Sequence, residues 1–171
     1  SKISANRLVL IGHSLGALIA SCYSAAFPEN VSGLVQIEGH GPLSEAPEQT
    51  VSRLRSGVLS RQRHRRKPSR PLASIEDAIK LRSITNHIKP ELIAPIVVRG
   101  VVNREGIWQW RYDPNLKCDS LYRMSQEHSD AIMASIVCPQ LIILGNDGFR
   151  HLQHNRYKLA DSDLRIERIP G

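Results

Sequence analysis

The residues from Gly12 to Gly16 carry the clearest chemical signal in the sequence. They read Gly-His-Ser-Leu-Gly and match the pattern G-x-S-x-G. In this pattern a serine on a sharp strand-to-helix turn exposes its hydroxyl, which can then attack a carbonyl carbon. The next backbone N–H, from Leu15, lies at the start of a helix and can donate to an oxyanion. We therefore interpret Ser14 as a candidate nucleophile and Leu15 as a candidate oxyanion-hole donor.

The segments around Ser14 have the pattern that this chemistry requires. Residues 7–12 form an apolar run that ends in glycine, which is typical of a strand buried in a parallel sheet. Residues 14–27 favour a helix that ends before Pro28, and residues 31–37 resemble a second buried strand. The order strand, helix, strand predicts two parallel strands. An ordinary turn with Ser14 as a helix cap remains the alternative.

The block 41–119 interrupts this alternation and is expected to be a helical insertion. Within it we expect three helices and one hairpin, over residues 48–66, 74–84, 90–99 and 101–110. The alternation then resumes with a helix, a strand, a helix and an edge strand, over residues 125–137, 140–145, 153–160 and 164–169. The predicted core therefore comprises residues 1–40 and 120–171, with the insertion between them.

The net charge and the cysteine content indicate which partners and which cellular location are expected. The formal net charge is +7, and the excess is local to eight basic residues: Arg53, Arg55, Arg61, Arg63, Arg65, Arg66, Lys67 and Arg70. We interpret this run as a solvated helix face opposite an apolar stripe that packs inside the insertion, formed by Val51, Leu54, Val58 and Leu59. Because no aromatic residue is interleaved, nucleic acid is not expected as a partner. The apolar runs are too short for a membrane span, and three unpatterned cysteines favour a reducing, cytoplasmic location.

The string from Leu8 to Ala17 (Leu-Val-Leu-Ile-Gly-His-Ser-Leu-Gly-Ala) resembles the nucleophile region of α/β-hydrolases. The order of predicted elements resembles the C-terminal half of that fold, with its N-terminal strands missing. Three further segments resemble the serine hydrolase-like branch and its bacterial relatives, residues 37–43, 110–113 and 138–145. The resemblance implies an α/β fold in which helices flank a mostly parallel sheet. It also implies that the insertion is a cap, or lid, over the pocket.

The family's catalytic acid commonly follows the next-to-last strand, and the resemblance carries this role to Asp147. The acid would fix the tautomer of a histidine and stabilise the imidazolium. An ordinary turn aspartate before Gly148 is the alternative interpretation of Asp147. Glu38 is the alternative acid, because some members of the family place the acid after the preceding strand.

The family's histidine lies on the loop after the last strand, and here the sequence departs from the pattern. None of the seven histidines occupies that position, and the sequence stops at Gly171. We therefore expect a histidine beyond Gly171 to act as the base. Without it, Ser14 would be a weak nucleophile and this segment alone would be inactive.

The sequence thus predicts a serine hydrolase that acts on an ester-like bond of a small-molecule substrate through a Ser-His-Asp triad. No metal or organic cofactor is implied. Two other functions are considered, an inactive hydrolase fold used for binding and a binder of anionic surfaces through the arginine-rich helix. Substrate identity and oligomeric state do not follow from the sequence. Because the family pairs the nucleophile strand on both sides, we also expect Val9 and Ile11 to lie on an exposed edge that promotes association.

Overall fold

The computed structural model describes residues 8–66, 71–153 and 163–170. It divides into two compact units. The sheet unit comprises Ser1–Thr50 and Tyr122–Gly171, and the helical unit comprises Val51–Leu121.

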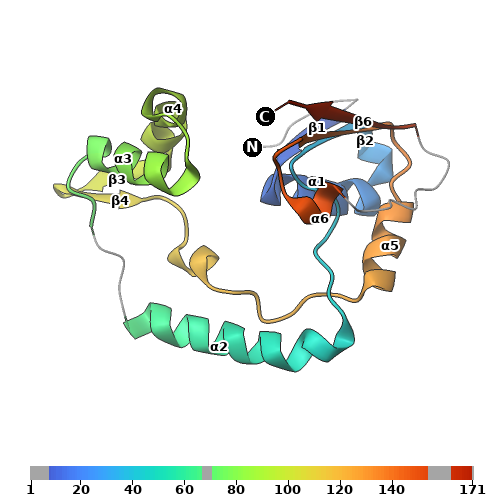
Figure 1. Ribbon diagram of the computed structural model, residues 1–171, viewed down its shortest axis with the longest axis horizontal. Helices are drawn as coiled ribbons and strands as arrows, with labels where there is room; N and C mark the ends of the chain where they lie inside the picture. Colours follow the sequence, from blue (N-terminus) through green and yellow to red (C-terminus); the bar gives the residue numbers. More distant parts are fainter. Residues whose placement is uncertain (1–7, 67–70, 154–162, 171) are drawn as a thin grey trace. The chain divides into compact units, whose positions relative to one another are not determined.

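Among the described residues, the sheet unit contains four parallel strands in the order β1-β2-β5-β6. Strands β1, β2 and β6 are labelled in Figure 1. They are β1 (Leu8–His13), β2 (Val31–Ile37), β5 (Gln140–Gly145) and β6 (Leu164–Ile169). The four strands predicted from the apolar runs are therefore present. Because all four run in the same direction, their carboxyl ends lie at one edge of the sheet.

One face of the sheet carries the core of this unit. The described part of the unit includes α1 (Leu15–Ala26), α5 (Gln126–Ala134) and the short α6 (Arg150–Gln153). Helices α1 and α5 pack together, and Leu152 of α6 packs against Ile142 and Leu144. The largest fully buried apolar side chains are Leu34, Ile136, Ile142 and Leu144. Burial of such side chains contributes roughly 1.5–3 kcal/mol each.

Strand β1 lies at the edge of the described sheet, where its only strand partner is β2. The side chains of Val9 and Ile11 are 58% and 70% exposed. These residues alternate with Leu8 and Leu10 and point to the opposite face of the sheet. An unpaired edge beside exposed apolar side chains is a template for pairing with another chain.

We expect the 171-residue chain, expressed alone, to self-associate through this edge. Ile11→Lys should shift it toward the monomer, because a lysine on an edge strand opposes strand addition. Val137→Lys is the matched control, since Val137 is also exposed (71%) but lies outside the strands. Size-exclusion chromatography with light scattering would measure the mass. A chain that is monomeric without any substitution would contradict this prediction.

The helical unit is built on a small core of its own. It contains most of α2 (Thr50–Arg66), together with α3 (Ile75–Asn86) and α4 (Pro90–Gly100). An antiparallel hairpin of β3 (Val101–Arg104) and β4 (Ile107–Trp110) follows. The buried residues of this unit's core are Leu72, Ala78, Ile93, Val97 and Val101, and Trp108 and Trp110 pack against them. The two tryptophans of the hairpin therefore stabilise the helical unit itself.

Local signals for the helical unit are confirmed at its element ends. The Ser74 hydroxyl accepts a hydrogen bond from Asp77 N (3.1 Å), so Ser74 caps α3 as its pattern indicated. The hairpin turns at Glu105 and Gly106, whose φ angles are +53° and +83°. Both angles are those of a two-residue hairpin turn. The Asn103 side chain closes this turn by accepting from Gly106 N (2.9 Å).

The predicted packing of α2 is wrong. The helix turns a small residue toward its neighbours: Gly57 is buried, and a Cβ there would lie 2.9 Å from the side chain of Leu121. The Ser60 hydroxyl accepts from Asp119 N (3.1 Å) on the same side. The apolar stripe is exposed instead, by 78% at Val51, 50% at Leu54 and 41% at Val58 and Leu59. Close backbone approach at Gly57 excludes these larger side chains from the contact.

One predicted boundary differs from the structure, and one predicted helix lies almost entirely outside the described residues. Residues 41–50 belong to the sheet unit, because Ser44 bridges to Met124 and its hydroxyl donates to Gln126 Oε1 (2.7 Å). The predicted helix 153–160 falls almost entirely on residues 154–162, outside the described residues. The described residues also include three short 3₁₀ turns, Pro28–Asn30, Pro47–Gln49 and Pro114–Lys117. None of the described helices is long and apolar enough to cross a membrane.

Candidate active site

Ser14 occupies a sharp turn between β1 and α1. Its φ and ψ angles are +50° and −119°, and the residue is exposed. A positive φ at a residue other than glycine costs on the order of 1–3 kcal/mol and persists only where surrounding structure imposes it. Here Ser14 N donates to Ile37 O (2.9 Å), and Ser14 O accepts from Ala17 N (2.9 Å). The turn therefore holds a strained, accessible serine at the carboxyl end of β1.

Two glycines let the chain pass closely around Ser14. A Cβ at Gly12 would lie 2.5 Å from Ala17 N and would also collide with the carbonyl oxygen of Gly16. A Cβ at Gly39 would lie 2.7 Å from Ser14 O. At Gly16, by contrast, nothing described lies within 4 Å of such an atom. Of the two glycines in the motif, only Gly12 is therefore required by close contacts among the described residues.

We expect Gly12→Ala to destabilise the protein by roughly 1–3 kcal/mol, because the added methyl group collides with backbone that cannot move aside alone. Gly16→Ala is the matched control and should be neutral or slightly stabilising, since alanine favours the first turn of a helix. Thermal melting of both variants would measure the difference. Equal melting temperatures would show that the strand and helix are not packed this closely.

Leu15 is the first residue of α1. Its N–H is therefore among the four that have no acceptor within the helix, and it lies at the positive end of the helix dipole. The first turn of α1 contains no acidic residue that would compete for this N–H. This position is compatible with the predicted role of Leu15 as an oxyanion donor.

Glu38 follows β2 and has a φ of +46°, which is also strained for a residue with a side chain. Its backbone N–H donates to Ile143 O (3.0 Å), and its carboxylate Oε1 accepts from Gly145 N. A Cβ at Gly148 would lie 2.6 Å from the other carboxylate oxygen. The Glu38 carboxylate is thus wedged between the end of β2 and the turn that follows β5.

Asp147 lies in that same turn. The turn from Gly145 to Gly148 is closed by a hydrogen bond from Gly148 N to Gly145 O (3.0 Å). Asn146 N donates to Ile169 O (2.9 Å), which ties the turn to the end of β6. Asp147 itself is exposed. The two candidate acids therefore involve the same turn: the Glu38 carboxylate contacts its two glycines, and Asp147 is one of its residues.

A chain of hydrogen bonds between buried polar side chains supports the elements around the site, and it was not predicted from the sequence. Ser21 of α1 donates to Gln36 Oε1 (2.7 Å), and Gln36 Nε2 donates to Gln140 Oε1 (3.3 Å). All three side chains are buried. Gly41 N also donates to the Ser21 hydroxyl (3.3 Å), which connects the loop after Glu38 to α1. Glutamines inside the apolar runs of two buried strands were the available signal.

The described histidines do not identify a base. His13 ends β1 and is exposed, while His128 and His151 lie on α5 and α6. His40 is half-buried in the loop after β2, and burial lowers its pKa to about 4, so its imidazole is neutral at neutral pH. His64 and His87 belong to the helical unit, and His154 lies outside the described residues. In the described chain, the residue after β6 is Pro170.

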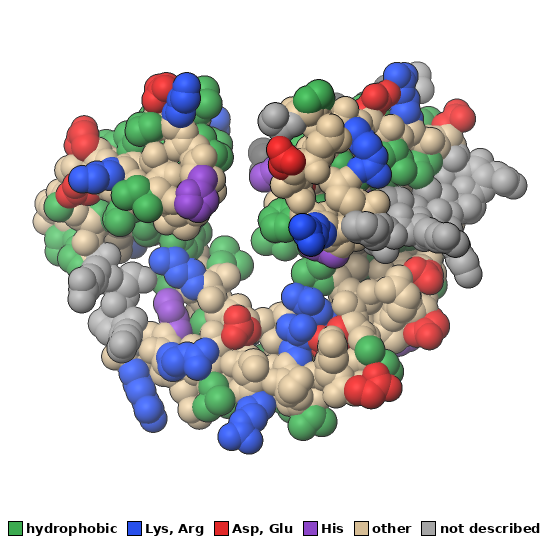
Figure 2. All heavy atoms as spheres, viewed as in Figure 1, with side chains coloured by type: hydrophobic (Ala, Val, Ile, Leu, Met, Phe, Trp, Pro, Cys, Tyr) green, Lys and Arg blue, Asp and Glu red, His purple; other side chains and the backbone are tan. Residues whose placement is uncertain are grey.

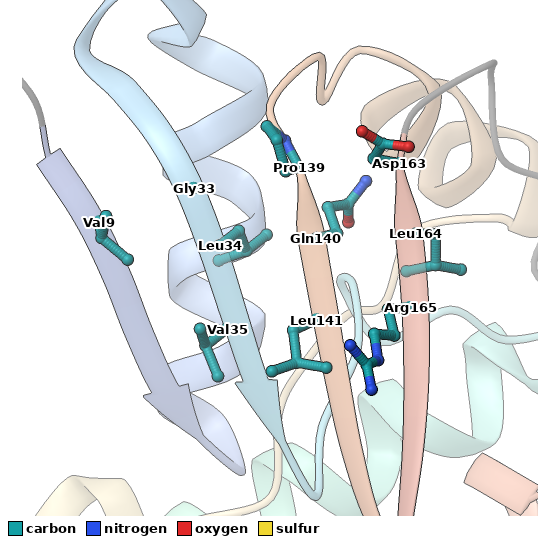
Figure 3. Close-up of a pocket in the computed structure, with 10 residues that line it drawn as sticks. All are labelled: Val9, Gly33, Leu34, Val35, Pro139, Gln140, Leu141, Asp163, Leu164 and Arg165. Carbon is teal, nitrogen blue, oxygen red and sulfur yellow. The ribbon is translucent and has the colours of Figure 1, made fainter.

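A cavity of about 390 Å³ lies on the sheet (Figure 3). Its lining includes Val9, Gly33, Pro139 and Asp163. Pro139 and Asp163 directly precede β5 and β6, so the cavity lies toward the amino ends of these strands. Ser14 follows the carboxyl end of β1, at the opposite edge of a parallel sheet. This cavity is therefore not a pocket for the candidate nucleophile. Among the described residues, no group of His, Cys, Asp and Glu side chains could hold a metal ion.

Comparison with known proteins decides the family. The family model described as the alpha/beta hydrolase fold matches residues 2–148. This chain belongs to the alpha/beta hydrolase fold family. Family membership confirms the predicted fold class, a mostly parallel sheet with flanking helices. It also agrees with the position of Ser14, since members with a serine nucleophile place it on such a turn.

Relatives of this family member include curated and solved proteins. A serine hydrolase-like protein of Dictyostelium discoideum is 28% identical over 153 residues, which are 84% of this chain and 42% of that protein. A hypothetical protein of Pseudomonas aeruginosa PAO1 shares the fold with a TM-score of 0.80 at 24% identity, over 97% of this chain and 60% of the other. A thioesterase domain from the curacin biosynthetic pathway matches with a TM-score of 0.69 at 18% identity, over 97% and 60%. The chain thus spans less than two thirds of the length of these proteins.

Proposed function

We propose that this chain carries the nucleophile of a serine hydrolase that cleaves an ester-like acyl bond in a small-molecule substrate. The observation that supports this proposal most directly is the strained, exposed Ser14 at the start of α1. Backbone strain of this kind is retained at functional sites. The name of the Dictyostelium relative, serine hydrolase-like protein, agrees with a serine nucleophile.

The proposed reaction has two steps, acylation of Ser14 and hydrolysis of the acyl-enzyme. Ser14 Oγ attacks the carbonyl carbon while its proton passes to a histidine, and the oxyanion accepts a hydrogen bond from Leu15 N–H. The C–O bond to the leaving alcohol then breaks, the histidine protonates that alcohol, and an acyl group remains on Ser14. Water next attacks the acyl carbon and gives its proton to the histidine, which returns it to Ser14 as the carboxylic acid leaves.

In this proposal, Asp147 orients the histidine and Glu38 positions Asp147. The contact of the Glu38 carboxylate with Gly145 N and with Gly148 holds the turn on which Asp147 lies. Glu38 is also the alternative acid, because some members of the family place the acid after the preceding strand. The substitutions Asp147→Asn and Glu38→Gln distinguish these roles.

The base in this proposal is a histidine outside residues 1–171. The position after β6 is the one that α/β-hydrolases use for the histidine of the triad. The turn containing Asp147 is tied to Ile169 at the end of β6, so a residue following β6 would lie near this acid. The helical unit serves as the cap of the enzyme and selects the substrate. This arrangement requires no metal or organic cofactor.

A fluorophosphonate probe tests the proposal, because it reacts covalently only with an activated serine. The natural protein that carries this sequence should be labelled, and mass spectrometry of the digested protein should locate the label on Ser14. Absence of labelling in a folded protein would favour the alternative of an inactive hydrolase fold used for binding.

A further inference from the structure

Helix α2 turns its apolar side chains away from its own packing contacts. Gly57 and Ser60 lie on the packed side of the helix, toward Leu121 and Asp119. Successive residues of a helix are rotated by about 100°. On this spacing, Val51 and Val58 lie about 180° and 160° from Ser60 and about 120° and 100° from Gly57, and both are exposed. The exposure of this apolar stripe therefore follows from the side on which the helix packs.

The same helix has an extreme charge. From Thr50 to Arg66 it contains no aspartate or glutamate and carries six arginines, Arg53, Arg55, Arg61, Arg63, Arg65 and Arg66. Four of these are exposed: Arg55, Arg63, Arg65 and Arg66. Arginine and apolar side chains alternate along α2 in the space-filling view (Figure 2). Arginines in the last turn stabilise the helix through its dipole, but the dipole gives no reason for an exposed apolar stripe beside them.

Charge and side-chain type select among possible occupants of this face. A second copy of the chain would bring two arginine-rich helices together, which their charges oppose. Nucleic acid would be attracted by the arginines, but α2 has no aromatic residue for base stacking and its apolar stripe would stay in water. A membrane surface with anionic headgroups accommodates both features, since arginines reach the phosphates while apolar side chains enter the headgroup boundary.

We propose that the exposed face of α2 binds the surface of membranes that contain anionic phospholipids. This face is defined by Val51, Leu54, Val58, Arg55, Arg65 and Arg66. The proposal does not depend on the hydrolase function. A hydrolase held on a membrane in this way would act beside lipid rather than throughout the surrounding solution.

Vesicle flotation tests this proposal with the purified 171-residue chain. Vesicle-bound protein rises in the gradient and self-associated protein sinks, so the two are separated. Vesicles of phosphatidylcholine alone are compared with vesicles that contain about 30% phosphatidylserine, an anionic lipid. The unmodified chain should float only with the anionic vesicles, and added salt should weaken the binding.

Two variants test the arginines and the apolar residues of this face separately. The triple variant Arg55→Gln, Arg65→Gln and Arg66→Gln should lower the partition coefficient on the order of 100-fold, because each arginine contributes about five-fold. Val51→Ser with Leu54→Ser should lower it by about ten-fold, since these side chains would no longer be buried in the headgroup boundary. The control is Leu81→Ser with Ile84→Ser on α3, where both residues are exposed (53% and 62%). The control should bind like the unmodified chain.

Three results would overturn the proposal. The first is equal flotation with neutral and anionic vesicles, and the second is unchanged binding of the arginine variant. The third is binding that depends on the arginines alone and is matched by salt-sensitive retention on heparin. That last result would assign the face to a soluble polyanion such as nucleic acid. Circular dichroism of each variant would show that the helix content is retained.

Discussion

Ser14→Ala is expected to lower the rate of ester hydrolysis by about 10⁴–10⁶-fold and to abolish labelling by a fluorophosphonate. The reason is that the hydroxyl of Ser14 forms the covalent bond to the acyl group, and no neighbouring side chain can replace it at this turn. The measurement is the hydrolysis of a chromogenic ester by the natural protein that carries this sequence. Loss of rate should come from kcat rather than from KM, because the methyl group of alanine leaves the pocket open.

Ser135→Ala is the control for this prediction. Ser135 is exposed in the same sheet unit, and its hydroxyl only donates to Ala131 O (2.9 Å) at the end of α5. Its substitution should leave both hydrolysis and labelling unchanged. Retention of hydrolysis in Ser14→Ala would remove Ser14 from the mechanism, even though the strained turn itself would remain.

Asp147→Asn is expected to lower kcat by about 10⁴-fold, because an amide cannot stabilise an imidazolium and favours the wrong histidine tautomer. Glu38→Gln should reduce kcat by less than about ten-fold, because its amide oxygen can still accept from Gly145 N and keep the turn in place. The two substitutions are matched, since each replaces one carboxylate oxygen by NH₂. Steady-state kinetics of both variants measures the difference.

The reverse result would be equally informative. A large loss with Glu38→Gln and a small one with Asp147→Asn would make Glu38 the acid and Asp147 an ordinary turn residue. Two small losses would contradict a role for either of these two carboxylates in orienting the histidine.

The elements of the sheet unit could be predicted from sequence because their signals are local. An apolar run such as residues 7–12 can be buried only as a strand between layers, and the glycine at its end marks the turn before Ser14. Helix ends were also predictable where a side chain caps the backbone, as Ser74 does at α3. Such signals depend on neighbours within a few residues, so one sequence is sufficient to identify them.

The features that were missed depend on residues far apart in the chain. The packing of α2 is decided by the backbone of residues near Leu121, and hydrophobic periodicity could not show that the buried side would be Gly57. The contact of Glu38 with Gly145 and Gly148 joins positions more than a hundred residues apart, and so does that of Gln36 with Gln140. Nothing in the local pattern at residue 38 indicates where its carboxylate lies.

The pairing of β2 with β5 has a consequence for how the chain folds. Gln36 and Gln140 bond across 104 positions of sequence, and the helical unit lies between them. The entropy of closing so long a loop is lost before the pairing provides any contact. The helices of residues 51–121 and the pairing of β1 with β2 join residues that are closer in sequence. We therefore expect them to form before β2 pairs with β5. We expect the joining of β2 to β5 to be the slow event, and until it occurs the edges of both strands can pair with other chains.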